Sequence, residues 1–142
     1  MLKSLIILGF ALVASTTNAA SAVSFYKHPT WQGAKVNCPG FNEYDKCYSV
    51  NAGIGMRSGE YVNEDPHRSK FSLTVYSGPA CNGMYDRWSF TRAPFSKRYG
   101  FDFIPTLKDN IQSFKVAAFH TSMVSGGYAG LNPEHTVPSG CQ

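Results

Sequence analysis

An internal repeat constrains the fold of this chain more than any other feature. The segment 23–33 aligns without a gap on the segment 73–83, at an offset of fifty residues. Each copy has an apolar–polar–apolar stretch, then a tyrosine, a proline three residues later and a glycine seven residues after the tyrosine. Proline restricts one backbone angle and glycine accepts conformations closed to other residues, so each copy predicts a strand that enters a tight hairpin. We therefore expect two copies of one β unit.

The rest of the chain shows the same strand periodicity. Short alternating runs, bounded by Gly, Pro, Asn and Asp, occur at 22–26, 71–76 and 111–116. No window places apolar residues at helical spacing over three turns, so helix should be limited to one or two turns. Many short strands at close spacing predict an all-β sandwich or barrel.

The cysteines predict covalent cross-links. There are four, Cys38, Cys47, Cys81 and Cys141, and an even number in an oxidising compartment predicts two disulfides. The spacing allows three pairings. One of them closes a short turn-rich loop between Cys38 and Cys47 and ties the tail to the body through Cys81 and Cys141. No C-x-x-C pair supports a zinc site instead.

The first nineteen residues predict a signal peptide. Lys3 precedes an apolar run at 4–14, and small residues lead to a cleavage site after Ala19. The run is shorter than the roughly 20 residues that span a bilayer, so we expect secretion and no transmembrane segment. The 123 residues that follow have the size of one domain.

Within that domain, we expect the two copies of the β unit to occupy 20–116. Residues 117–142 belong to neither copy and form a C-terminal extension, which Cys141 should pin to the domain. We expect at most one further strand there, near 118–124.

The charge is mildly basic. Thirteen Lys and Arg face nine Asp and Glu, which become twelve against nine, or +3, once Lys3 is removed. Such a balance favours anionic phospholipid or acidic polysaccharide over a neutral partner, but the charges are scattered and form no basic block. We therefore expect an ordinary solvated surface, no nucleic-acid partner and a monomer.

The motif Tyr26-x-x-x-x-Trp31-x-Gly33 resembles the Greek-key signature of the βγ-crystallin superfamily. The second copy keeps Tyr76 and Gly83 but has a cysteine in place of the second aromatic residue. The likeness covers 22–116, and the segment 73–83 resembles the small secreted plant antimicrobial members.

This resemblance implies a two-sheet β-sandwich built from two Greek keys, each of which contributes a strand to the other's sheet. It also implies that Trp31 packs inward beside the tyrosine.

The resemblance further suggests calcium, although no cofactor is required. The run at 109–113 is similar to the family's (N/D)(N/D)xx(S/T) element, with Asp109, Asn110 and Ser113 as oxygen ligands of the kind that calcium prefers. An alternative register leaves Gln112 where the hydroxyl belongs. The residues fifty positions earlier, 59–63, contain no such element.

Nothing in the sequence indicates an enzyme. The four histidines are spread over turns and the tail: His28, His67, His120 and His135. No serine-hydrolase, zinc-protease or phosphate-loop motif occurs. A glycosidase would need two of four carboxylates to converge in space: Glu60, Glu64, Asp65 and Asp102.

Aromatic residues suggest a binding surface, because an exposed ring beside a turn can stack on a ligand. Trp88, between Arg87 and Arg92, is the candidate. The leading hypothesis is a non-enzymatic secreted binding or defence protein, antimicrobial or toxin-like, that acts on a microbial surface, a polysaccharide or a secreted protein. The alternatives are a secreted calcium-binding structural protein and an extracellular protease inhibitor that uses the loop 92–99.

Overall fold

The computed structural model describes residues 21–41, 44–50, 56–65, 69–91, 97–101, 107, 110–118, 123–130, 136–138 and 141. These residues form short strands and one turn of 3-10 helix: β1 (Ser21–His28), η1 (Pro29–Trp31), β2 (Gln32–Phe41), β3 (Cys47–Ser49), β4 (Ser58–Val62), β5 (Lys70–Tyr76), β6 (Gly83–Thr91), β7 (Arg98–Phe101), β8 (Ser113–Ala118), β9 (Val124–Ala129) and β10 (Thr136–Pro138). The predicted all-β class is confirmed.

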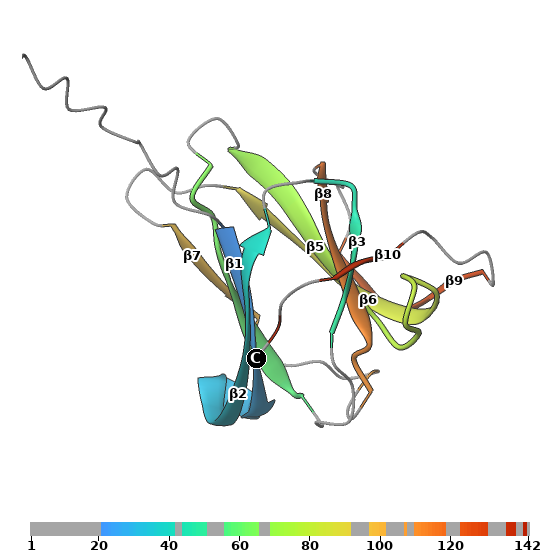
Figure 1. Ribbon diagram of the computed structural model, residues 1–142, viewed down its shortest axis with the longest axis horizontal. Helices are drawn as coiled ribbons and strands as arrows, with labels where there is room; N and C mark the ends of the chain where they lie inside the picture. The colour runs from blue at the N-terminus through green and yellow to red at the C-terminus, as the bar shows by residue number, and fades with distance from the viewer. Residues whose placement is uncertain are drawn as a thin grey trace, which may run out of the picture.

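The strands form two sheets (Figure 1). Sheet A has the order β2-β1-β4-β7, and sheet B the order β10-β3-β8-β5-β6-β9. The strand pairs are antiparallel, except that β10 runs parallel to β3. Two strands join the sheet opposite to that of their sequence neighbours: β3 pairs with β8 in sheet B, and β7 pairs with β4 in sheet A. The sheets are therefore linked by exchanged strands as well as by packing.

The predicted repeat appears as two hairpins with the same backbone geometry. One hairpin joins β1 to β2 and the other joins β5 to β6. Two positive-φ residues in the first turn have positive-φ counterparts in the second turn, fifty positions later. Trp31 and Cys81 have φ of 58° and 54°, and Gly33 and Gly83 have φ of 83° and 80°. Glycine adopts such angles readily, whereas a bulky residue there is strained.

A buried serine holds each hairpin turn in the same way. The Ser58 hydroxyl donates to the His28 carbonyl at 2.7 Å and accepts from the Trp31 N–H at 3.1 Å. The Ser113 hydroxyl donates to the Gly78 carbonyl at 2.6 Å and accepts from the Cys81 N–H at 2.8 Å. Both serines are fully buried.

The turn residues that the two serines bind are fifty positions apart in the sequence, but the serines themselves are fifty-five positions apart. The second copy is therefore longer than the first between its hairpin and its serine. If Ser113 is aligned with Ser58, the segment of the first copy that corresponds to 109–113 is 54–58. The fifty-residue offset used above, which gave 59–63, is therefore wrong for this part of the chain.

We expect Ser58→Ala and Ser113→Ala each to lower the free energy of unfolding by about 1 to 3 kcal/mol, because each leaves a turn carbonyl and a turn N–H without their buried partner. Urea denaturation of each variant measures this loss. Ser69→Ala, at an exposed position, is the control and should change stability by less than about 0.5 kcal/mol. A serine variant as stable as this control would show that the turns hold without the hydroxyls.

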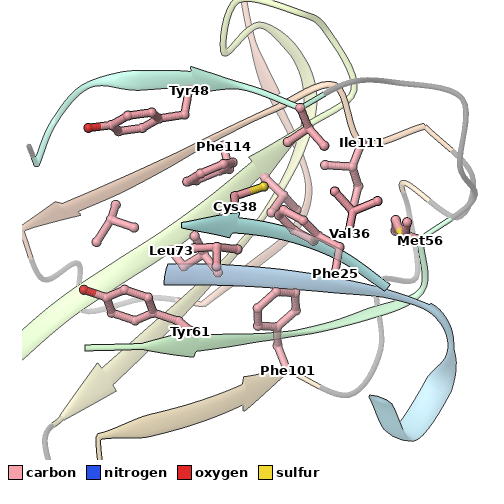
Figure 2. Close-up of a cluster of buried hydrophobic side chains, with 14 of the residues drawn as sticks. Phe25, Val36, Cys38, Tyr48, Met56, Tyr61, Leu73, Phe101, Ile111 and Phe114 are labelled. Atoms are coloured by element: carbon pink, nitrogen blue, oxygen red, sulfur yellow. The ribbon is translucent and has the colours of Figure 1, made fainter. Parts of the chain in front are cut away.

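The hydrophobic core lies between the two sheets (Figure 2). Phe25 from sheet A contacts Phe101 of the same sheet at 6.2 Å and Phe114 of sheet B at 5.9 Å, measured between ring centroids. Tyr48, on the exchanged strand β3, stacks on Phe114 at 5.4 Å. All of these rings are buried, so the aromatic residues, which the sequence has in excess, fill a sandwich-like interior.

Both predicted disulfides form, but the pairing differs from the one described above. Cys38 is bonded to Cys141, and Cys47 to Cys81. The first bond ties the tail to β2 across 103 residues, and the second ties the exchanged strand β3 to the β5–β6 turn. A bond from Cys38 to Cys47 would have to join β2 in sheet A to β3 in sheet B, because the chain changes sheets between them.

The region after 117 holds two described strands where one at most was expected. β9 pairs with β6 at one edge of sheet B, and β10 pairs with β3 at the other edge. Most of the expected strand near 118–124 lies outside the described residues, and β9 begins at Val124. Among the described residues helix is limited to η1, as predicted, and none of them forms a helix long and apolar enough to cross a membrane. The signal peptide at 1–19 lies outside the described residues.

Candidate functional site

Trp31 is an exposed aromatic residue on the outward face of sheet A. Its side chain is 48% exposed, so the expectation that it packs inward is wrong. In β7 the neighbours Tyr99 and Phe101 are buried, so a Cβ on Gly100 would point away from the core. That Cβ would meet the Trp31 indole at 2.3 Å, which shows that the ring lies over Gly100.

Three contacts hold the Trp31 ring in place. The backbone N–H donates to the Ser58 hydroxyl, and the indole N–H donates to the Gly59 carbonyl at 2.8 Å. The glycine at position 100 lets the ring lie directly on the strand backbone, where a larger residue would displace it. The indole N–H is thus used within the protein, and about half of the Trp31 surface faces solvent.

Polar and aromatic side chains surround Trp31 on the same face. Tyr26 pairs in register with Ser58 on one side and with Lys35 on the other, and the Lys35 ammonium lies 5.6 Å from the Tyr26 ring centroid. Glu60 pairs in register with Gly100, which the indole covers, and accepts from Arg98 at 3.0 Å. Glu60 is therefore beside the position that the indole covers, whereas Tyr26 on β1 and Lys35 on β2 lie further across the same face, in the strand order β2-β1-β4-β7. We call Tyr26, Trp31, Lys35, Glu60 and Arg98 the Trp31 face.

Two further cations lie at the hairpin end of sheet A. Lys27 and Arg57 are both exposed, and the Arg57 N–H donates to the Tyr26 carbonyl at 2.8 Å. They therefore lie on adjacent strands next to the Tyr26–Ser58 pair. The described residues of this end include three cations, Lys27, Lys35 and Arg57, so charges that look scattered in the sequence gather here.

The surface predicted around Trp88 is organised differently. Trp88 is half-buried and stacks on Phe101 of sheet A at 4.6 Å, so its ring packs against the core. Arg87 donates to the Thr74 hydroxyl at 3.1 Å and lies 5.1 Å from the ring centroid of Tyr85. Arg92 lies outside the described residues. The structure thus turns Arg87 and Trp88 to opposite faces of sheet B.

The calcium motif is used at least partly for structure. The Ser113 hydroxyl forms hydrogen bonds to the β5–β6 turn, as described above. The Asn110 side-chain oxygen accepts from the Gln112 amide at 2.8 Å, and Asp109 lies outside the described residues. No group of three or more metal-ligating side chains occurs within the described part of the chain. Calcium binding stays a prediction, which melting temperatures with calcium and with chelator would test.

Two of the carboxylates considered for glycoside hydrolysis form ion pairs. Glu60 pairs with Arg98, and Glu64 pairs with Lys97 at 2.7 Å. The Asp65 N–H donates to Asn63, and Asp102 lies outside the described residues. Of the loop 92–99, positions 92–96 also lie outside, and Arg98 and Tyr99 belong to β7.

One sequence signal could have located the Trp31 face. Gly100 interrupts an alternating strand between Tyr99 and Phe101, and a glycine inside a strand often marks a close approach by another group. The sequence does not indicate which group approaches, because Trp31 and Gly100 are brought together only by the pairing of β4 with both β1 and β7.

Comparison with known proteins assigns no function, so the function must be inferred from the site. No family model, no curated protein and no solved structure matches this chain.

Proposed function

We propose that this protein is a secreted, non-enzymatic binding or defence protein that acts on a cell surface through the Trp31 face. The observation that carries the proposal is the exposed, firmly held ring of Trp31. An exposed aromatic ring held in one orientation loses little conformational entropy on binding, so it is suited to anchor a partner.

The backbone of Trp31 supports this proposal. Trp31 has a positive φ, which costs a bulky residue of order 1 to 3 kcal/mol, and glycine would avoid that cost. At the equivalent position of the second hairpin, Cys81 bears the same conformation and its side chain forms a disulfide. We infer by analogy that the Trp31 side chain is also needed, and that its exposed half is available to a partner.

Secretion is part of the proposal. Two disulfides are typical of proteins from oxidising compartments, and the first nineteen residues have the pattern of a signal peptide. The repeated hairpins and the exchange of β3 and β7 between the sheets are the arrangement that a βγ-crystallin-like pair of Greek keys would have, and they support the proposed relation to the small antimicrobial members.

We expect Trp31→Ala to weaken binding to microbial cells, and growth inhibition by the protein, by about tenfold or more, the size of effect seen when an aromatic anchor is removed. Binding is measured by cell pull-down at low salt and again at high salt, where the contribution of the cations should fall.

Tyr128→Ala is the matched control. Tyr128 is 64% exposed but lies on β9 in sheet B, so its removal should change binding by less than twofold. Equal binding by wild type and Trp31→Ala, or the absence of binding and of inhibition over a broad microbial panel, would refute the proposed function.

A further inference from the structure

The Trp31 face combines one flat aromatic ring with an excess of positive charge. Lys35 and Arg98 lie on this face together with Glu60, and Lys27 and Arg57 are exposed at the hairpin end of the same sheet. Glu60 is already paired with Arg98, so its charge is balanced within the face. Among the described residues, the remaining three cations, Lys27, Lys35 and Arg57, make this end of sheet A complementary to an anionic partner.

We propose, building on the function above, that the ligand of the Trp31 face is an acidic polysaccharide. One sugar ring stacks its C–H face on the outward face of the Trp31 indole, which carries the negative part of the ring quadrupole. The carboxylate or sulfate groups of the neighbouring sugars pair with Lys35 and with the cations of the hairpin end. A polysaccharide with one acidic group per sugar or per disaccharide can stack on the ring and pair with the cations at the same time.

The geometry of Trp31 favours a sugar over a membrane. A membrane-binding surface inserts a contiguous apolar area into the lipid. Here the indole covers Gly100 and its N–H is held by Gly59, so the ring rests on the sheet and does not extend outward as a wedge. The other exposed large hydrophobic residues among those described, Met84, Met123 and Tyr128, lie in or beside β6 and β9 of sheet B, and add nothing to this face. One flat ring is sufficient for a sugar.

Polar groups beside the ring also suit a sugar. Ser24 and Glu60 pair in register on this face, and Ser24 donates to Asn37 at 2.8 Å. Ser24 is itself buried, so the amide of Asn37 and the carboxylate of Glu60 are the groups of this row that can exchange hydrogen bonds with sugar hydroxyls. A lipid tail would instead have to desolvate these groups without compensation.

The test measures binding to polygalacturonate, alginate and hyaluronate, with dextran as the neutral polymer. The variant Trp88→Phe leaves Trp31 as the single tryptophan, so its fluorescence and its protection from iodide quenching report on the ring directly. We expect at least one acidic polymer to bind and to protect Trp31, and dextran to bind at least about tenfold more weakly, because it lacks the charges that pair with the cations.

Two variants and a control separate the contribution of the ring from that of the charge. In a protein with both tryptophans, Trp31→Ala should weaken binding about tenfold or more. Lys35→Glu should weaken it about fivefold and reduce its salt dependence. Lys70→Glu makes the same charge change at an exposed position of β5 in sheet B and should have less than a twofold effect.

Gly100→Ala provides a variant that keeps the tryptophan. The added methyl group would lie 2.3 Å from the indole in its present position, so the ring must move. We expect binding to fall as much as in Trp31→Ala while circular dichroism shows a folded protein.

The outcomes distinguish this inference from the proposed function. If cells bind in a Trp31-dependent manner but none of the three acidic polymers binds, the polysaccharide inference is wrong and the proposed function stands. If vesicles with anionic lipid bind and the polymers do not, the partner is a membrane and the inference is again wrong. If cells do not bind at all, the proposed function itself fails.

Discussion

Removal of the Cys38–Cys141 disulfide by the double substitution Cys38→Ala/Cys141→Ala is expected to lower the free energy of unfolding by about 4 to 5 kcal/mol. The bond closes a loop with a sequence separation of 103 residues, and a cross-link over a long loop removes much conformational entropy from the unfolded chain. The loss is a large part of the roughly 5 to 15 kcal/mol that stabilises a domain of this kind. Urea denaturation under non-reducing conditions measures it.

The second disulfide provides the matched comparison. Cys47→Ala/Cys81→Ala opens a loop with a separation of 34 residues, so its loss should be smaller by about 1 kcal/mol. Peptide mapping of the unreduced protein checks the pairing itself. A peptide that links Cys38 to Cys47, or a Cys38/Cys141 double variant as stable as wild type, would contradict the structure.

Phe114→Ala is expected to cost about 3 to 5 kcal/mol, because it removes a large buried ring and leaves a cavity between the sheets. Phe114 has no exposed surface, and its ring contacts Phe25 of sheet A and Tyr48 of the exchanged strand β3. Its loss therefore weakens both the packing between the sheets and the attachment of β3. Thermal and urea denaturation measure the change.

The control at this position is Phe114→Leu, which keeps most of the apolar volume and should cost about half as much or less. Tyr128→Ala, at an exposed ring, should cost less than about 0.5 kcal/mol. If the alanine and leucine variants at position 114 lost equal stability, the cavity would not be the cause. The ring's specific contacts with Phe25 and Tyr48 would then be the alternative to test.

Local signals predicted the strands well. The alternation at 22–26 and 71–76 and the proline and glycine that follow correspond to β1, β5 and their hairpins. Such patterns are readable because side-chain alternation and glycine's access to positive φ are properties of a few consecutive residues. The tail was predicted less well, because β9 and β10 are short strands that form by pairing with the edges of an existing sheet.

The candidate site was harder to predict. Trp31 was expected in the core and Trp88 was a candidate for the surface, whereas Trp31 is exposed and Trp88 packs on Phe101. An aromatic residue beside a turn has no periodicity that indicates its direction. The direction of Trp31 depends on Gly59 and Gly100, which lie far away in the sequence.

The sequence by itself determined the all-β class, the two hairpins and the presence of cross-links, because each depends on residue type and short-range spacing. The tertiary structure alone decided which cysteines pair, which serine holds which turn and which ring reaches solvent. These depend on the exchange of β3 and β7 between the sheets, which brings residues tens of positions apart into contact. Such long-range pairings are selected by the packing of the whole core, and no local segment carries enough information to specify them.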